Sequence, residues 1–216
     1  MSRIFDTRQP TERADGIAAA IDAVRRGGLV VLPTDTVYGI GADAFDRRAV
    51  ADLITAKGRG RDMPVPVLVG SWRTLDGLVM SVDQRTRDLL EAFWPGGLTL
   101  VVEHAPSLAW DLGDAYGTVA VRMPLHPVAL EILAETGPMA VSSANATGHP
   151  PAATAAEAQA QLGYQVGVYL EAGEGGAQVP STIVDVTRDV PRVLRLGAVG
   201  LDELRKVVPE LEASTG

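Results

Sequence analysis

The chain has 216 residues, 46% of them hydrophobic, with 27 acidic and 19 basic side chains, a formal net charge of −8 and no cysteine. This length is enough to bury one good core, so we expect a single domain. The acidic balance argues against a protein that coats nucleic acid, and the lack of cysteine excludes disulfides and thiolate zinc sites. The chain has no 18-residue apolar run and no signal-peptide h-region at its start, which predicts a cytoplasmic protein that does not enter a membrane.

Segments with apolar residues at helical spacing alternate along the chain with short β-branched runs. Asp46 and Thr154 stand at positions where they would cap helices. We predict helices over residues 11–27, 49–54, 83–93, 126–135, 154–162 and 201–208. We predict strands over residues 29–33, 65–69, 98–103, 118–124, 139–141, 166–170, 181–186 and 190–195.

This alternation indicates an α/β fold. The last two strands flank residues 187–189 and are expected to pair as an antiparallel hairpin, so the sheet should be mixed. The glycine-rich residues 171–180 are predicted to form a mobile loop next to Ser181. Most of the strands end in polar residues instead of a plain turn, and this repetition is the strongest sign of a binding site.

The first polar cluster follows the strand at 29–33 and contains Thr34, Thr36 and Tyr38. A second cluster, Lys57, Arg59 and Arg61, lies between glycines after the helix at 49–54. Hydroxyl groups beside a glycine-spaced cationic loop suit a polyanion. Because only two of the 19 basic residues are lysines, Lys57 stands out: it is either a cation that complements the C-terminal end of the preceding helix or part of a site that needs a compact ammonium.

Common catalytic motifs do not account for these clusters. Residues 39–44 match the dinucleotide fingerprint, but Asp43 and Asp46 would face the pyrophosphate, and no helix begins directly after the glycines. Ser142 and Ser143 lack the elbow glycine and triad partner of a hydrolase nucleophile. The three histidines show no metal-ligand spacing. The clusters together favour a concave cationic pocket that holds a nucleotide and a small carboxylate.

The ordered motifs resemble the YrdC-type threonylcarbamoyl-AMP synthases, and the likeness spans about residues 15–207. The matching stretches are Pro-Thr-Asp-Thr-Val-Tyr-Gly at 33–39, Lys-Gly-Arg at 57–59, Trp-Pro-Gly-Gly-Leu-Thr at 94–99, Val-Ala-Val-Arg-Met-Pro at 119–124, Ser-Ser-Ala-Asn at 142–145, Ser-Thr-Ile-Val-Asp at 181–185 and Leu-Arg-Leu-Gly at 194–197. The resemblance implies a YrdC/RibB-like twisted mixed sheet with flanking helices, in one domain over residues 1–216. The chain ends soon after the last motif, as short members of the family do.

The resemblance also implies an activity. Such an enzyme joins L-threonine, bicarbonate or CO2, and ATP into threonylcarbamoyl-AMP with release of pyrophosphate. Mg²⁺ arrives with ATP and needs no protein side chain as ligand. The product passes to a complex that modifies the adenosine beside the tRNA anticodon, and no strong direct binding of nucleic acid by this chain is expected.

Site residues follow from the resemblance position by position. Thr36, Arg122, Ser143 and Ser181 correspond to ligands of threonine. Lys57, Arg59, Thr118, Asn145 and Arg195 correspond to ligands of ATP, and Lys57 and Arg59 are also the expected catalytic residues. Secondary candidates are Thr34, Tyr38, Arg61, Met63 and Thr154.

Two positions depart from the family pattern. Met63 stands where members often have asparagine, and Leu68 where they often have a polar residue, so the resemblance supplies no ATP contact at the first and no threonine contact at the second. Two other functions fit the same residues: a noncatalytic RNA-binding module, which the acidic charge and the 5% aromatic content disfavour, and a paralogue that makes another carbamoyl adenylate.

Overall fold

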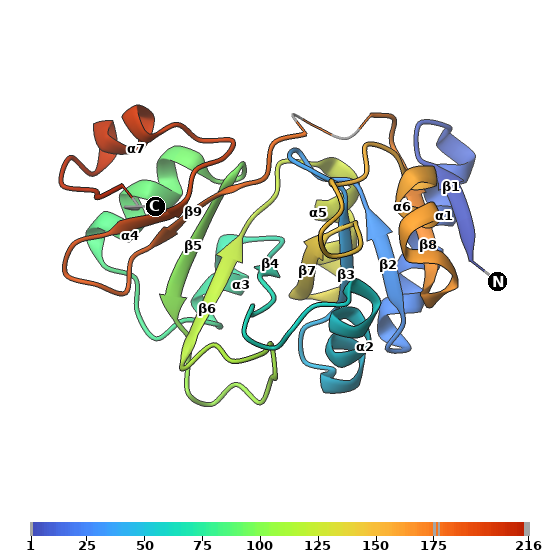
Figure 1. The fold of residues 1–216 in the computed structure, drawn as a ribbon, viewed down its shortest axis with the longest axis horizontal. Helices are drawn as coiled ribbons and strands as arrows, with labels where there is room; N and C mark the ends of the chain where they lie inside the picture. The colour runs from blue at the N-terminus through green and yellow to red at the C-terminus, as the bar shows by residue number, and fades with distance from the viewer. Residues whose placement is uncertain (1, 175, 177, 214–216) are drawn as a thin grey trace.

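The centre of the molecule is one large mixed sheet, seen in a computed structural model that describes residues 2–174, 176 and 178–213 (Figure 1). Within these residues the sheet has ten strands in the order β1-β8-β2-β3-β7-β4-β6-β5-β9-β10. In that order the strands are Arg3–Asp6, Val166–Glu171, Leu29–Leu32, Gly39–Asp43, Met139–Ser143, Val67–Leu68, Thr118–Arg122, Leu98–Glu103, Thr182–Asp185 and Arg192–Arg195. The predicted α/β class with a mixed sheet is confirmed.

Strand pairing mixes both directions. β8 runs parallel to β1 and to β2, and β5 runs parallel to β9, whereas β3 is antiparallel to both of its neighbours, β2 and β7. The predicted hairpin is present, because β9 and β10 pair in antiparallel fashion. Parallel pairs join segments far apart in the sequence, so the central strands gather residues from most of the chain.

The helices are α1 (Pro10–Arg25), α2 (Arg47–Lys57), α3 (Trp72–Asp76), α4 (Gln84–Phe93), α5 (Pro127–Thr136), α6 (Ala155–Leu162) and α7 (Leu201–Val207), with a short 3₁₀ turn at Gly163–Gln165. The predicted caps are confirmed: the Asp46 carboxylate accepts from the first turn of α2, and the Thr154 hydroxyl accepts from the backbone of Glu157 in α6.

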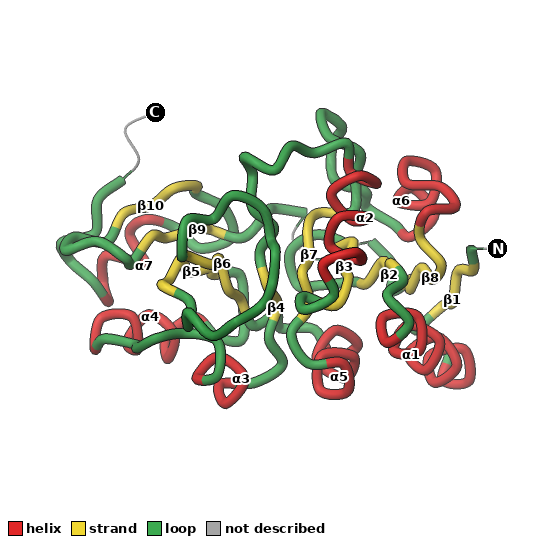
Figure 2. The backbone as a smooth tube through the Cα atoms, turned by 90° about the horizontal axis from the view of Figure 1, so that it is seen from below, coloured by secondary structure: helices red, strands yellow, loops and turns green. Residues whose placement is uncertain are grey.

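Helices cover both faces of the sheet around β2, β3 and β7. Figure 2 shows α1 and α5 on one side of these strands and α2 and α6 on the other. On the first side, Ile17 and Ile132 belong to the same buried apolar cluster as Leu32. On the second, Leu53 and Leu162 join Val31 and Ile40. Strands buried on both faces hold the loops at their ends in fixed places.

Two strands and one helix were not predicted from the sequence. β3 begins at Gly39, inside a segment that reads as a hydroxyl-rich loop, and its glycines allow close approach: a Cβ at Gly39 would lie 2.5 Å from Val141 Cγ1. β1 is a short edge strand, α3 is only five residues long, and β4 covers two residues of the predicted 65–69. The predicted loop at 171–180 includes Gly175 and Ala177, which lie outside the described residues.

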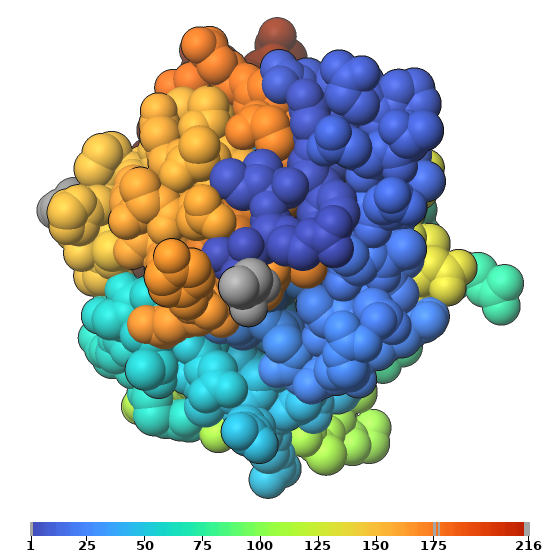
Figure 3. Space-filling model, turned by 90° about the vertical axis from the view of Figure 1, so that its right-hand side faces the viewer, coloured from blue at the N-terminus to red at the C-terminus, as the bar shows by residue number. Residues whose placement is uncertain are grey.

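The N-terminal strand β1 forms one edge of the sheet. β1 pairs in parallel with β8, and Figure 3 shows the first residues of the chain packed against the region of β8 and α6. No helix in the described part of the chain is both long and apolar enough to cross a membrane.

Candidate functional site

A cavity of about 420 Å³ opens on the central strands. Three strands supply most of its strand lining: Thr99 and Val101 of β5, Thr118, Ala120 and Arg122 of β6, and Val141 and Ser143 of β7 alternate along their strands, and Val119 and Ser142 between them also border it. Because side chains of a strand alternate between its faces, the alternating residues project to one side of the sheet. The β2–β3 loop contributes Thr34 and Thr36, and the start of β9 contributes Ser181. The volume suits a small-molecule site.

The charged side chains among the lining residues are the arginines Arg59, Arg122 and Arg195. Burial lowers the pKa of Arg195, and the positive charge of Arg59 lowers it further. Burial also lowers the pKa of Arg122; Asp35 offsets part of this effect, while Arg195 adds to it. Burial and the neighbouring positive charges both disfavour the charged forms of Arg122 and Arg195. An anion bound between them would offset both effects. The cavity is therefore suited to an anionic ligand.

Arg122 is held by three acceptors. Its Nε donates to the Gly96 carbonyl at 2.8 Å, Nη1 donates to Thr36 Oγ1 at 2.7 Å, and Nη2 donates to Asp35 Oδ1. A guanidinium has five N–H groups, so one remains on each terminal nitrogen. Two N–H groups are what a bidentate carboxylate requires. The structure thus brings the predicted threonine ligands Thr36 and Arg122 into direct contact.

Arg59 is the least satisfied of the three guanidinium groups. Its Nη1 donates to Ser142 Oγ at 3.1 Å and its Nη2 to the Pro64 carbonyl at 3.4 Å, while its Nε is buried and has no hydrogen-bond partner among the described residues. Burial lowers its pKa, and Asp62 acts in the opposite direction. A partly buried cation whose N–H groups are not all used is suited to bind the oxygen of a ligand.

A further group of contacts in the cavity centres on Ser181. Its hydroxyl lies 2.7 Å from Thr99 Oγ1, and its carbonyl accepts from Arg195 Nη2 at 2.8 Å. Thr118, predicted as an ATP ligand, lines the same cavity, and its hydroxyl donates to the Ala115 carbonyl. Ser143 and Thr34 also line it. The cavity therefore contains most of the predicted site residues.

Lys57 and Asn145 lie behind the cavity wall. Lys57 is only 4% exposed as a residue, and its ammonium donates to the carbonyls of Ser143 and Asn145, both at 2.6 Å, and to Asn145 Oδ1 at 3.1 Å. Burial, with a contribution from Arg59, lowers the pKa of Lys57 to about 8. In this structure the lysine holds the loop after β7 in place, and its contact with phosphate stays a prediction, as does that of Asn145.

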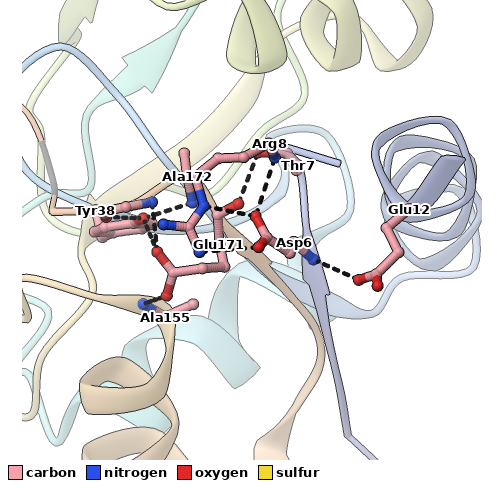
Figure 4. Close-up of polar contacts among 9 residues, drawn as sticks. Asp6, Thr7, Arg8, Glu12, Tyr38, Ala155, Glu171 and Ala172 are labelled. Atoms are coloured by element: carbon pink, nitrogen blue, oxygen red, sulfur yellow. Dashed lines mark hydrogen bonds and ion pairs between the residues drawn. The ribbon is translucent and has the colours of Figure 1, made fainter. Parts of the chain in front are cut away.

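Tyr38 borders the cavity, but its hydroxyl is bound elsewhere (Figure 4). That hydroxyl lies 3.0 Å from Glu171 Oε1 and 2.7 Å from the Gly173 carbonyl, and it accepts from the Ala172 N–H. The other oxygen of Glu171 accepts from the Ala155 N–H at the start of α6. Burial raises the pKa of Tyr38. This tyrosine ties the β2–β3 loop to the end of β8.

The remaining secondary candidates are not among the described residues that line the cavity. Arg61 forms surface ion pairs with Asp111 and Asp114, Met63 is 42% exposed, and Thr154 caps α6. Leu68, one of the two departures from the family pattern, is buried and lines the cavity beside Arg122, its neighbour across the β4–β6 pair.

Two polar residues of the site were missed by sequence reasoning. Ser142 accepts from Arg59, and Asp35 accepts from Arg122. Both are direct neighbours of predicted ligands, and Asp35 is the charged residue between Thr34 and Thr36. The signal available in the sequence was Asp35 itself, a carboxylate between two threonines of a pocket that was expected to be cationic.

No group of three or more His, Asp or Glu side chains among the described residues is placed to hold a metal ion. The described residues that line the cavity offer hydroxyl groups and arginines but no carboxylate. The described lining thus supplies hydroxyl oxygens and positive charge, and no carboxylate of the kind that Mg²⁺ takes as a protein ligand.

Comparison with known proteins agrees with the motifs. The family model for Sua5, YciO and YrdC proteins, described as "Telomere recombination", matches residues 22–197. A Mycobacterium leprae relative, provisionally named a threonylcarbamoyl-AMP synthase, is 60% identical over 214 residues, which cover 99% of this chain and 97% of that one. The threonylcarbamoyl-AMP synthase of Pyrococcus abyssi is 35% identical over 212 residues, or 98% of this chain.

The solved structures include Sua5 of P. abyssi in complex with L-threonine, which matches with a TM-score of 0.91 and 33% identity over 99% of this chain. This chain spans 62% of the length of that chain. Sequence model, relatives and fold agree over nearly the whole length, and the chain therefore belongs to the Sua5/YciO/YrdC family.

Proposed function

We propose that this protein is a threonylcarbamoyl-AMP synthase, which makes L-threonylcarbamoyladenylate and pyrophosphate from L-threonine, bicarbonate or CO2, and ATP. The observation that carries the proposal is the cavity itself, in which Arg122 offers two N–H groups beside the hydroxyls of Thr36 and Ser181 while Arg59 and Arg195 lie nearby. The names of the relatives and the threonine complex of P. abyssi Sua5 support it.

Threonine binds with its carboxylate on Arg122, in a bidentate arrangement that fits a planar guanidinium. Thr36, Ser143 and Ser181 surround the rest of the amino acid. ATP places its phosphates against Arg59 and Arg195, with Thr118 beside them. Mg²⁺ arrives on the nucleotide and adds positive charge at its phosphates.

The reaction then forms two bonds. The threonine nitrogen bonds to the carbon of CO2, or of bicarbonate with loss of hydroxide, and gives up a proton. One oxygen of the new carboxylate bonds to the α-phosphorus of ATP, while the bond from that phosphorus to its bridging oxygen breaks and pyrophosphate leaves. Both steps bring anions together, so the protein acts by positioning them and neutralising their charge.

The product is a reactive mixed anhydride, and a tRNA-modifying complex is its consumer. We place the protein in the cytoplasm with that complex. An RNA-binding module without catalysis is the weaker alternative, because the described lining residues near Arg59, Arg122 and Arg195 include one aromatic residue, Tyr38, whose hydroxyl is already bound. A paralogue that makes another carbamoyl adenylate would share the cavity but not the choice of amino acid.

The test is release of pyrophosphate by the purified protein with ATP, Mg²⁺ and bicarbonate, with each amino acid added in turn. We expect release that depends on threonine and on bicarbonate. Release that is equal without an amino acid, or that another amino acid supports best, would reject this function.

A further inference from the structure

Asp35 lies beside the cavity but is not among the residues that line it. Its Oδ1 accepts from Arg122 Nη2 and, at 2.8 Å, from the backbone N–H of Leu125. The ion pair is largely sheltered, with side-chain exposures of 7% for Arg122 and 18% for Asp35. One carboxylate oxygen thus joins the β2–β3 loop to the guanidinium and to the chain that leaves β6.

These contacts define the plane of the guanidinium. Gly96, Thr36 and Asp35 come from three separate segments, and each takes a different nitrogen of Arg122. A planar group held at three nitrogens cannot rotate without breaking at least one bond. The two remaining N–H groups therefore point in fixed directions before any ligand arrives, which reduces the cost of ordering on binding.

We propose that Asp35 is a positioning residue for the amino acid substrate: it aims the free N–H groups of Arg122 at the substrate carboxylate without touching the substrate. This inference rests on the proposed function, in which Arg122 binds threonine. The negative charge of Asp35 by itself opposes a second carboxylate on the same arginine. The benefit of Asp35 is therefore geometric, and this separates its role from simple charge compensation.

The substitution Asp35→Asn separates the geometric effect of this residue from the effect of its charge. Asp35→Asn keeps an oxygen that can accept from both Arg122 and Leu125, whereas Asp35→Ala removes it and leaves the Leu125 N–H and the buried Arg122 cation without that partner. We expect Asp35→Ala to raise the KM for threonine by about 10- to 100-fold, the range for a lost hydrogen bond to a charged group. The KM for ATP should stay at the wild-type value, and Asp35→Asn should keep a KM for threonine close to that of the wild type.

The matched control is Asp185→Ala. Asp185 also pairs with an arginine, Arg188, and accepts from a backbone N–H, that of Thr187, but Arg188, unlike Arg122, is not among the cavity-lining residues. This control should lose stability and keep both KM values. A double-mutant cycle adds a readout that a general loss of structure does not give: if Asp35 acts through Arg122, Asp35→Ala should add little to the threonine KM of Arg122→Lys.

The outcomes are decisive in each case. An unchanged threonine KM in Asp35→Ala, an equal rise in both KM values, or an Asp35→Asn variant as impaired as Asp35→Ala would overturn the proposal. If Asp35→Ala does not fold, Asp35→Glu takes its place, because it keeps the charge but moves the carboxylate, and it should raise the threonine KM. Failure of the wild type to depend on threonine would instead reject the proposed function.

Discussion

Within the described part of the chain, the buried Nε of Arg59 has no partner and the side chain makes two hydrogen bonds, the longer at 3.4 Å. Replacing it therefore removes little from the free protein. We expect Arg59→Ala to weaken ATP binding by about 1.5–3 kcal/mol, as measured by calorimetry, with almost no change in Tm. Arg25→Ala, which removes a surface arginine paired with Glu135, should leave ATP affinity unchanged. Wild-type affinity in Arg59→Ala would remove this residue from the ATP site.

The hydroxyls of Thr36, Ser143 and Ser181 around Arg122 predict how the amino acid is chosen. A site that hydrogen-bonds a substrate hydroxyl rejects an analogue without it by up to about 10⁴-fold, whereas a missing methyl costs on the order of 10–200-fold. Pyrophosphate release at fixed ATP and bicarbonate should therefore rank threonine first, serine second and valine last. Valine turning over as well as serine would show that the hydroxyl is not recognised.

Lys57 makes a pH-dependent contribution to stability. Its pKa is about 8 in the folded protein, below the ordinary value of 10.5 expected for the unfolded chain. Between these values the unfolded chain binds more protons, so the stability of the wild type rises with pH across this window. Lys57→Met removes the donor to two buried carbonyls and should cost about 1–3 kcal/mol near neutral pH.

That loss should grow from about pH 7.5 to about pH 10, because only the wild type gains stability from the lysine there. Urea denaturation of both proteins across the window measures the difference, and the variant controls for all other titrating groups. A loss that shrinks with rising pH would contradict the lowered pKa.

Among the elements, β3 depends most on a pair of glycines. A Cβ on Gly39 would lie 2.5 Å from Val141 Cγ1, so Gly39→Ala forces a β-branched side chain of β7 to move. We expect a loss of about 1–3 kcal/mol in the free energy of unfolding. Gly167→Ala in β8 is the control, because its nearest contact would be the Leu29 carbonyl at 3.9 Å. Equal stability of the two variants would show that β3 and β7 are not tightly packed.

β3 also shows why the sequence pattern did not predict every strand of the sheet. Residues 39–43 contain two glycines and no alternation, and they form a strand because β2 and β7 pair with them on both sides. Helices with side-chain caps, such as α2 and α6, were predictable because the signal lies within a few residues. The family resemblance named site residues most of which line the cavity, but nothing local in the sequence placed Asp35 on Arg122, 87 positions away.

At the scale of the whole molecule, the formal charge of −8 disfavours binding of nucleic acid to the surface. Non-specific binding of nucleic acid comes almost entirely from phosphate contacts with basic side chains, with dissociation constants of about 10⁻⁴–10⁻⁶ M for proteins that have them. We expect labelled tRNA to show no saturable binding tighter than about 10⁻⁴ M at physiological salt, measured by fluorescence anisotropy. Micromolar binding would require a basic surface that the composition does not suggest.

Figure 4 shows that Thr7, near the start of the chain, donates from both its backbone N–H and its hydroxyl to the Glu171 carbonyl, each at 2.7 Å. Glu171 in turn holds Tyr38 in the loop that carries Thr36. A protein trimmed to residues 22–197 would keep every cavity-lining residue and would lose Thr7 together with β1. The boundary of the family model is therefore not the boundary of the contacts that support the cavity, and a minimal catalytic unit should include β1 and Thr7, although neither supplies a catalytic residue.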